Sequence, residues 1–233
     1  MNKSSGFKVE AIIPAYNEEA SIGRVLDDLS RLGLDRILVV DNNSADRTAE
    51  VAGKHGAEVV FEPKRGYGQA CWRGILALSP DTDVVLFLDA DYSDYPEEAV
   101  HLLQPIYEEK ADLVIGSRIL GNAEPSALLP QARFGNWLAG VLINLLYGYR
   151  YTDLGPFRAI RRESLDKIGM QDRGFGWTVE MQVKALKTGL KVREVPVSYR
   201  PRIGKSKISG TFRGSVRAGH MILYTIFKYF FAD

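Results

Sequence analysis

The feature that most constrains this 233-residue chain is an unbroken apolar run, residues 84–88, that ends in two carboxylates. A β-branched and aromatic run without a polar position predicts a central parallel strand that is buried on both faces. Asp89 and Asp91 follow this run, so both acids stand at the carboxyl edge of the strand, where ligands bind in open α/β sheets. In extended chain the two side chains point to the same side. The pair therefore predicts a shared Mg²⁺ or Mn²⁺, since these ions take oxygen ligands and keep water and substrate phosphates; a solvated turn is the alternative.

Strand-like runs alternate with helical segments in the first half of the chain. The expected strands are residues 9–13, 36–40, 57–61, 84–88 and 113–118, and helices are expected at 19–32, from about 70 to 78, and from about 96. Short connections of this kind predict an α/β fold with a doubly wound, mostly parallel sheet flanked by helices. The first strand is followed by neither a dinucleotide fingerprint nor a Walker A loop, which argues against a nicotinamide dehydrogenase.

Composition and charge narrow the possible compartment and partners of the protein. The single cysteine, Cys71, allows no disulfide framework, and no signal peptide precedes Val9, so the cytoplasm is the expected compartment. Residues 1–150 hold 14 basic and 22 acidic side chains, a net charge of −8, whereas residues 151–233 hold 16 and 7, a net charge of +9. The basic part is a candidate surface for substrate phosphates or an anionic membrane. It matches no nucleic-acid-binding motif, so no nucleic acid partner is expected.

The second half departs from simple alternation. Residues 119–130 are irregular and are expected to form a mobile flap, while apolar residues 137–149 are too few to span a bilayer. Residues 153–162 combine an acid, a turn and three arginines; a helix is expected at 178–187, a strand at 191–199 and a final amphipathic helix at 211–231. We expect residues 1–210 to form the main domain. The helix in 211–233 is expected to pack on the sheet, to pack on a second subunit in a homodimer, or to lie peripherally in a membrane interface.

Four motifs then occur in order. They are residues 14–18 (PAYNE), residues 40–46 (VDNNSAD), the pair Gly66 and Gly68, and Asp89-Ala90-Asp91. With these motifs the chain resembles the family 2 glycosyltransferases of the GT-A fold. Arg202 with residues 204–207 (GKSK), after residues 155–159 (GPFRA), resembles more narrowly the dolichyl-phosphate mannose synthase branch. The resemblance implies inverting transfer of a hexose from a GDP- or UDP-sugar with the help of a divalent metal.

The same resemblance assigns residues to a donor site. It implies that Pro14, Tyr16 and Glu18 line the nucleoside pocket, that Asp41 contacts base or ribose, that Asp89 meets ribose or metal-bound water, and that Asp91 ligates the metal. Ala15, Lys64, Gly68 and Ala90 are expected in the same site. Arg202 and Lys207 are candidates for neutralising the diphosphate as it leaves.

The acceptor stays open between two chemistries. A polyprenyl phosphate is already ionised near neutral pH, whereas a sugar or alcohol hydroxyl needs a general base. Asp153 and then Glu180 are the candidates for that base, with a structural salt bridge as the alternative for each. Arg118, Arg133 and Arg158 are candidate contacts for a lipid phosphate.

Some residues of this chain differ from the pattern of that branch, and these differences leave the acceptor open. Ser93 and Asp94 stand where the branch often has Gln and His, and the Gln-x-x-Arg-Trp signature of processive synthases is absent. Two other classes of protein fit the sequence less well. A receiver-type signalling module has only about half this length. A sugar nucleotidylyltransferase has a glycine-rich loop with an arginine after its first strand, and that loop is missing here. We therefore expect a membrane-associated hexosyltransferase that adds one sugar to a polyprenyl phosphate, with a soluble or glycolipid hydroxyl as the second acceptor class.

Overall fold

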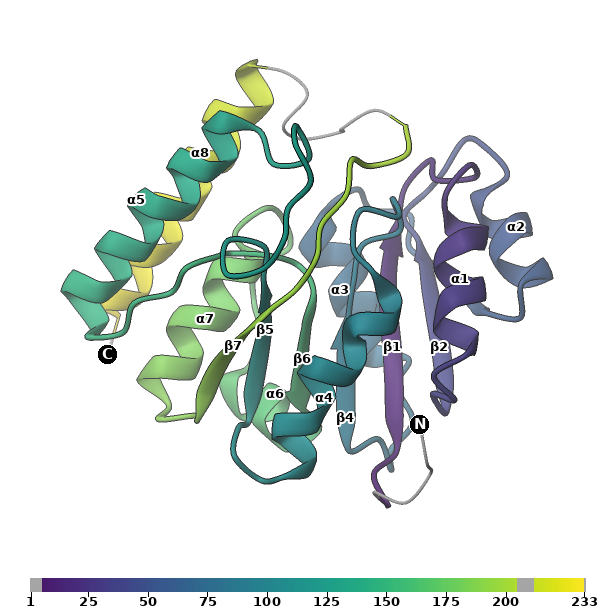
Figure 1. Cartoon of the computed structure of the whole chain (residues 1–233), viewed down its shortest axis with the longest axis horizontal. Coiled ribbons are helices and arrows are strands. Elements are labelled where there is room, and N and C mark those ends of the chain that lie inside the picture. Colours follow the sequence, from purple (N-terminus) through teal and green to yellow (C-terminus); the bar gives the residue numbers. More distant parts are fainter. Residues whose placement is uncertain (1–5, 205–211, 233) are drawn as a thin grey trace.

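A mixed sheet forms the centre of the computed structural model, which describes residues 6–204 and 212–232 (Figure 1). In these residues seven strands lie in the order β3-β2-β1-β4-β6-β5-β7. Their bounds are β1 (Val9–Ala15), β2 (Arg36–Asp41), β3 (Glu58–Phe61), β4 (Val84–Phe87), β5 (Leu113–Ser117), β6 (Arg158–Arg161) and β7 (Val192–Pro196). The predicted α/β class and the mostly parallel sheet are confirmed.

Helices cover both faces of this sheet. They are α1 (Ile22–Ser30), α2 (Thr48–Lys54), α3 (Tyr67–Leu76), the short 3₁₀ helix η2 (Pro96–Glu98), α4 (Ala99–Tyr107), α5 (Pro130–Tyr147), α6 (Arg162–Ile168), α7 (Trp177–Lys187) and α8 (Phe212–Phe231). One core cluster joins the sheet to α1, α2 and α4, and the other joins it to α3, α5, α6, α7 and α8. Strand β1 shows why, because Ile12 faces one cluster while Ala11 and Ile13 face the other.

Like helix α6, strand β6 is an element that the sequence analysis missed. It runs antiparallel to both neighbours, β4 and β5, while the other pairs of the sheet are parallel. The segment had been interpreted as an acid, a turn and three arginines, because the short RAIR strand carries charge at both ends. Its two middle residues, Ala159 and Ile160, are fully buried between strands, and this long-range pairing leaves no local sequence pattern.

Several predicted boundaries move by a few residues. The first helix begins at Ile22 and not at residue 19, because the chain first makes a turn in which the Ser21 amide donates to the Glu18 carbonyl. Helix α5 begins seven residues earlier than expected, at Pro130, and proline suits a first helical turn. It ends before Gly148, whose φ of +73° is the left-handed conformation typical of a helix stop.

Helices α5 and α8, the two longest of the described helices, lie side by side along one end of the molecule, far from α1 and α2 (Figure 1). Tyr147 of α5 donates its hydroxyl to the Ile226 carbonyl of α8 at 2.7 Å, and its ring packs edge-on against Phe230. The inner face of α8 also packs on α7. None of the helices in the described part of the chain is long and apolar enough to cross a membrane.

Candidate active site

A cavity of about 260 Å³ opens at the carboxyl ends of β1 and β4. This is the edge at which the sequence placed the acid pair. Most of the residues predicted for the donor site line it, together with residues that were not predicted. The lining residues are Pro14, Ala15, Tyr16, Glu18, Asn42, Arg65, Gly66, Tyr67, Ala70, Asp89, Ala90, Asp91, Phe175 and Arg202.

The acid pair stands just beyond the end of β4. Asp91 is almost fully buried and its Oδ1 accepts hydrogen bonds from the amide and the hydroxyl of Ser93, at 2.9 and 2.5 Å. These bonds aim the carboxylate at the cavity. Asp89 is partly buried, and burial together with the nearby Asp91 charge raises its pKa to about 7. The negative charge of Asp91 opposes the ionisation of Asp89, and a cation bound beside the two carboxylates would relieve that repulsion.

A third carboxylate lies behind the pair. Asp94 is 2 % exposed, and its Oδ2 accepts a long hydrogen bond, 3.4 Å, from the Asp89 amide. Its buried Oδ1 has no hydrogen-bond partner among the described residues. Burial, followed by the charges of Asp89 and Asp91, raises the pKa of Asp94 well above the ordinary value. The loop after β4 therefore places a buried carboxylate behind the two acids that line the cavity.

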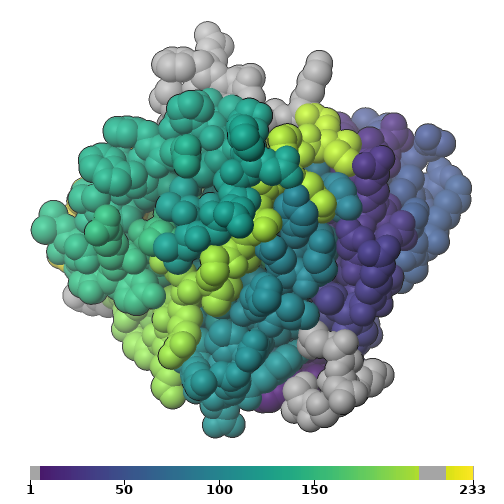
Figure 2. All heavy atoms as spheres, viewed as in Figure 1, coloured from purple at the N-terminus to yellow at the C-terminus, as the bar shows by residue number. Residues whose placement is uncertain are grey.

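An arginine side chain pairs with this negative charge. The Arg202 guanidinium lies 2.5 Å from Asp91 Oδ2 and 3.6 Å from Glu18 Oε1. The chain after β7 carries it there, and Figure 2 shows this yellow-green segment crossing the molecule toward the purple N-terminal part. Arg200 fastens the segment, since its side chain donates to the carbonyls of Tyr92 and Asp94 at 2.6 and 3.0 Å. Arg202 was predicted to contact the leaving diphosphate; in this structure it pairs with the acids Asp91 and Glu18 of the cavity lining.

The donor set fits a divalent metal. Asp91 and Asp89 supply carboxylate oxygens, the ligand type of Mg²⁺ and Mn²⁺, and Asp91 Oδ2 already holds a positive group. In the described residues no cluster of three or more His, Cys, Asp or Glu side chains is arranged to hold a metal alone. A metal at this pair would take its remaining ligands from water and from phosphate oxygens.

The cavity lining also contains two polar residues, Arg65 and Asn42, that the sequence analysis did not single out. The Arg65 guanidinium stacks on the Tyr16 ring, 3.5 Å from its centre. Asn42 holds the following loop in place, because its Nδ2 donates to the Lys64 carbonyl at 2.6 Å and its Oδ1 accepts from the Gly66 amide at 2.9 Å. The only available signal was adjacency, since Asn42 follows Asp41 and Arg65 follows Lys64.

Three predicted donor residues lie outside the cavity lining, and a fourth cannot be placed. Asp41 is buried and accepts from the Ser44 amide, and Lys64 is exposed. Gly68 packs against main chain: its amide donates to the Gly174 carbonyl at 3.1 Å, and an added Cβ would lie 2.5 Å from the Asp172 carbonyl oxygen. Gly68 is thus needed for close packing, a role different from the predicted one. Lys207 lies outside the described residues.

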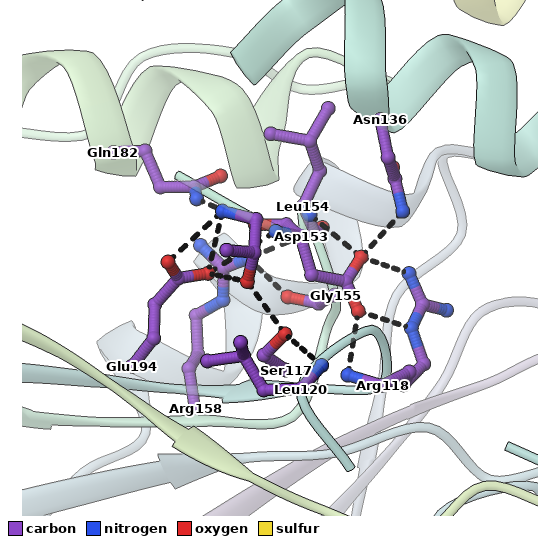
Figure 3. A network of polar contacts seen from close by, with 11 residues as sticks. Ser117, Arg118, Leu120, Asn136, Asp153, Leu154, Gly155, Arg158, Gln182 and Glu194 are labelled. Carbon is purple, nitrogen blue, oxygen red and sulfur yellow. Dashed lines mark hydrogen bonds and ion pairs between the residues drawn. The ribbon is translucent and has the colours of Figure 1, made fainter. Parts of the chain in front are cut away.

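The carboxylate that was the first candidate for a general base is locked in a buried network (Figure 3). Asp153 is fully buried, and its two oxygens accept from Nε and Nη2 of Arg118, both at 2.7 Å. Asn136, projecting from α5, donates to the same carboxylate at 2.5 Å, and the Leu154 amide does so at 2.7 Å. Of the two roles left open, the structural salt bridge is the one that this geometry supports.

Glu180 has the same kind of surroundings. It is fully buried in α7 and accepts from the Asp172 amide at 2.6 Å, from Lys184 at 2.8 Å and from the Tyr229 hydroxyl of α8 at 2.6 Å. These bonds hold the loop before α7 and fasten α8. A proton-abstracting role for Glu180 does not fit this placement, because no oxygen faces the cavity lining.

The three arginines that were predicted to contact an acceptor phosphate lie in different surroundings. Arg158 is 1 % exposed and donates to the carbonyls of Thr178, Leu154 and Gly155, so an acceptor cannot reach it. This corrects its prediction as an acceptor contact. Arg118 is mostly buried between Asp153 and the Tyr199 ring. Arg133 is exposed in the first turn of α5.

Comparisons with known proteins agree with this fold and site. The family model "Glycosyl transferase family 2" matches residues 10–169. An uncharacterized glycosyltransferase of Mycobacterium tuberculosis is 40 % identical over 221 residues, 92 % of this chain and 95 % of that protein. The dolichyl-phosphate hexose transferase of Haloferax volcanii is 35 % identical over 91 % of each chain, and the undecaprenyl-phosphate mannosyltransferase of Micrococcus luteus is 31 % identical over 89 % and 90 %.

A solved structure shares the architecture. Glucosyl-3-phosphoglycerate synthase from Mycobacterium tuberculosis, crystallised with Mn²⁺, UDP-glucose and phosphoglyceric acid, superposes with a TM-score of 0.78 at 23 % identity, covering 98 % of this chain and 81 % of that one. The fold and the acidic cavity define a glycosyltransferase of the GT-A class. The chain belongs to glycosyl transferase family 2, as its motifs indicated.

Proposed function

We propose that this enzyme transfers one hexosyl group from a nucleoside diphosphate sugar to a polyprenyl phosphate. The donor half of the proposal is supported by the acidic cavity and by the family. The acceptor half is supported by two relatives whose names contain dolichyl phosphate and undecaprenyl phosphate. A structural observation also distinguishes the two acceptor classes.

That observation is the state of the two candidate bases. Asp153 and Glu180 are both fully buried, and each is bonded to a cationic side chain. A hydroxyl acceptor needs a carboxylate within hydrogen-bond reach to take its proton. A phosphate monoester brings an ionised oxygen and needs none. The lock on both carboxylates therefore favours a phosphate acceptor.

Different residues of the cavity would bind the base and the diphosphate of the donor. Tyr16 and Arg65 offer a flat stacked surface for a nucleobase, of either a GDP- or a UDP-hexose. Asp91 and Asp89 would hold Mg²⁺ or Mn²⁺ at the diphosphate, and this ion when bound supplies Lewis-acid neutralisation of the leaving group. Arg202 stands beside Asp91 and is placed to bind diphosphate oxygens once it leaves that carboxylate.

The transfer step is then a single displacement. An oxygen of the acceptor phosphate forms a bond to the anomeric carbon on the face opposite the diphosphate. The bond from that carbon to the diphosphate oxygen breaks, and its electron pair leaves with the nucleoside diphosphate. No proton moves in this step, and the anomeric configuration is inverted.

The test is a transfer assay with labelled nucleotide sugars and Mn²⁺ or Mg²⁺. Undecaprenyl phosphate in detergent is compared with the unphosphorylated polyprenol and with soluble sugars. We expect label in a lipid product only with the phosphate, and release of that label by mild acid, which cleaves a glycosyl phosphate. Transfer to a soluble or lipid hydroxyl, with none to undecaprenyl phosphate, would overturn the acceptor assignment.

A further inference from the structure

The outer sides of α5 and α8 carry large apolar side chains in contact with solvent. Each helix shows an exposed stripe at helical spacing, while its inner side is buried in the core. We call these exposed residues the aromatic face. It consists of Phe134, Trp137 and Leu145 of α5 and Tyr224, Phe227 and Phe231 of α8. Leu145 and Phe231 are each 76 % exposed, which is unusual for side chains of this size on helices that pack side by side.

The charge around this face has one sign. Neither α5 nor α8 contains an Asp or Glu, and no acid occurs from residue 125 to 152 or from residue 195 to 232. Arg133 and Lys228 on these two helices and Arg150 just after α5 are exposed, whereas Arg200 and Arg202 of the second stretch are held at the cavity. The remainder of the chain is rich in acids, so this is a local property. A partner that matches an apolar centre and basic surroundings must itself offer apolar depth and negative charge.

We propose that α5 and α8 together dock this enzyme on the surface of an anionic lipid bilayer. Helices that lie in a membrane interface bury one apolar face among the acyl chains and keep basic residues at the headgroups. Trp137 and Tyr224 are the residue types that favour that interface. A second copy of the chain fits less well, because a two-fold interface would bring the same acid-free, basic segments face to face.

The position of the face relative to the site supports the same partner, and this step rests on the proposed lipid-phosphate acceptor. Asn136 projects inward from α5 and donates to Asp153, which pairs with Arg118 (Figure 3). Phe134 and Trp137, its near neighbours in the same helix, point outward. One helix thus separates the proposed membrane surface from the polar network beside the cavity. An acceptor anchored in that membrane would present its phosphate at the end of α5 where Arg133 is exposed.

The chain carries its own probe for this docking. Trp177 is buried and Trp72 lies under the Arg173 guanidinium, 3.8 Å from the ring centre, whereas Trp137 is 57 % exposed. With full-length protein and phosphatidylglycerol-containing vesicles we expect a blue shift of tryptophan emission and quenching by brominated acyl chains. Binding should weaken with salt and on pure phosphatidylcholine. No shift and no co-sedimentation with anionic vesicles would overturn the proposal.

A matched pair of variants separates the face from general surface apolarity. Leu145→Glu places a charge in the aromatic face, and Leu76→Glu does the same on α3, where the leucine is 60 % exposed. Burying a leucine side chain contributes roughly 1.5–3 kcal/mol, so L145E should lower vesicle affinity about tenfold or more. L76E should bind as the wild type does. Equal binding by both variants would reject the aromatic face as the docking surface.

Two controls keep this inference apart from the proposed function. L145E should bind nucleotide and Mn²⁺ as the wild type does, and should transfer normally to polyprenyl phosphate in detergent. Normal transfer without vesicle binding by the wild type would reject only the docking. Vesicle binding without transfer to any polyprenyl phosphate would reject only the acceptor. A dimer that L145E dissociates, with no vesicle binding by the wild type, would assign the face to a second copy.

Discussion

Two groups of carboxylates in this molecule were both predicted as site residues, and the structure places them in opposite situations. Asp89 and Asp91 lie on a cavity; Asp91 accepts from Ser93 through Oδ1, while its Oδ2 pairs with Arg202, which the C-terminal segment brings to it. Asp153 and Glu180 lie in the interior, where amide groups, an arginine or a lysine, and neighbouring side chains use their oxygens. The comparison teaches that the unused bonding capacity of a carboxylate, more than its place in a motif, decides whether it can serve chemistry.

Asp91→Asn should have the largest effect on activity. The amide keeps the size of the side chain but loses the charge that holds a divalent ion, so several kcal/mol of leaving-group stabilisation disappear. We expect transfer to fall roughly a thousandfold, about 4 kcal/mol in the barrier. Initial rates measure this loss. The thermal stabilisation by UDP or GDP with Mn²⁺ should also disappear, while the apo midpoint stays near that of the wild type.

The matched control for this variant is Asp46→Asn. Asp46 is a half-buried acid of the β2–α2 loop that accepts from the Thr48 amide, a bond an Asn oxygen can also accept, and it does not line the cavity. Transfer by D46N should stay within a few-fold of wild type. Normal turnover by D91N would contradict the comparison of the two groups of carboxylates, because Asp91 would then belong with the structural ones.

Asp153→Asn should act on stability instead. The substitution leaves Arg118, whose side chain is 12 % exposed, without its counter-charge, and such losses cost about 3 kcal/mol or more. Urea unfolding measures the change. Asp166→Asn is the control, since Asp166 forms a solvent-exposed ion pair with Arg162 and should leave the unfolding midpoint unchanged. If D153N were as stable as wild type and inactive, Asp153 would be the general base and the acceptor a hydroxyl.

The sequence predicted the parts of this structure that local patterns determine. Buried strands such as residues 84–88 and the amphipathic stripe of α1 have a period that the chain displays, and the acid pair follows a strand end directly. Contacts between distant segments have no such pattern. Arg65 on Tyr16, Gly68 against the Asp172 carbonyl and Arg158 on three carbonyls all depend on how separate elements meet. For this reason Asp89 and Asp91 could be placed on the cavity in advance, while the role of Asp153 could not be chosen.

Arg202→Ala should give the smallest effect, and it sharpens the comparison most. Its guanidinium lies 2.5 Å from Asp91 Oδ2, where it competes with any divalent ion for that oxygen, and the same group is placed to bind the diphosphate during transfer. Removing it should raise the affinity for Mn²⁺ alone a few-fold, and should lower transfer about tenfold to a hundredfold. Calorimetry without nucleotide and initial rates with saturating Mn²⁺ measure the two changes. Arg31→Ala, at a 77 % exposed side chain just after the C-terminal end of α1, should change neither. Weaker Mn²⁺ binding in R202A would show that the arginine organises the acid pair and does not occupy the place of the metal.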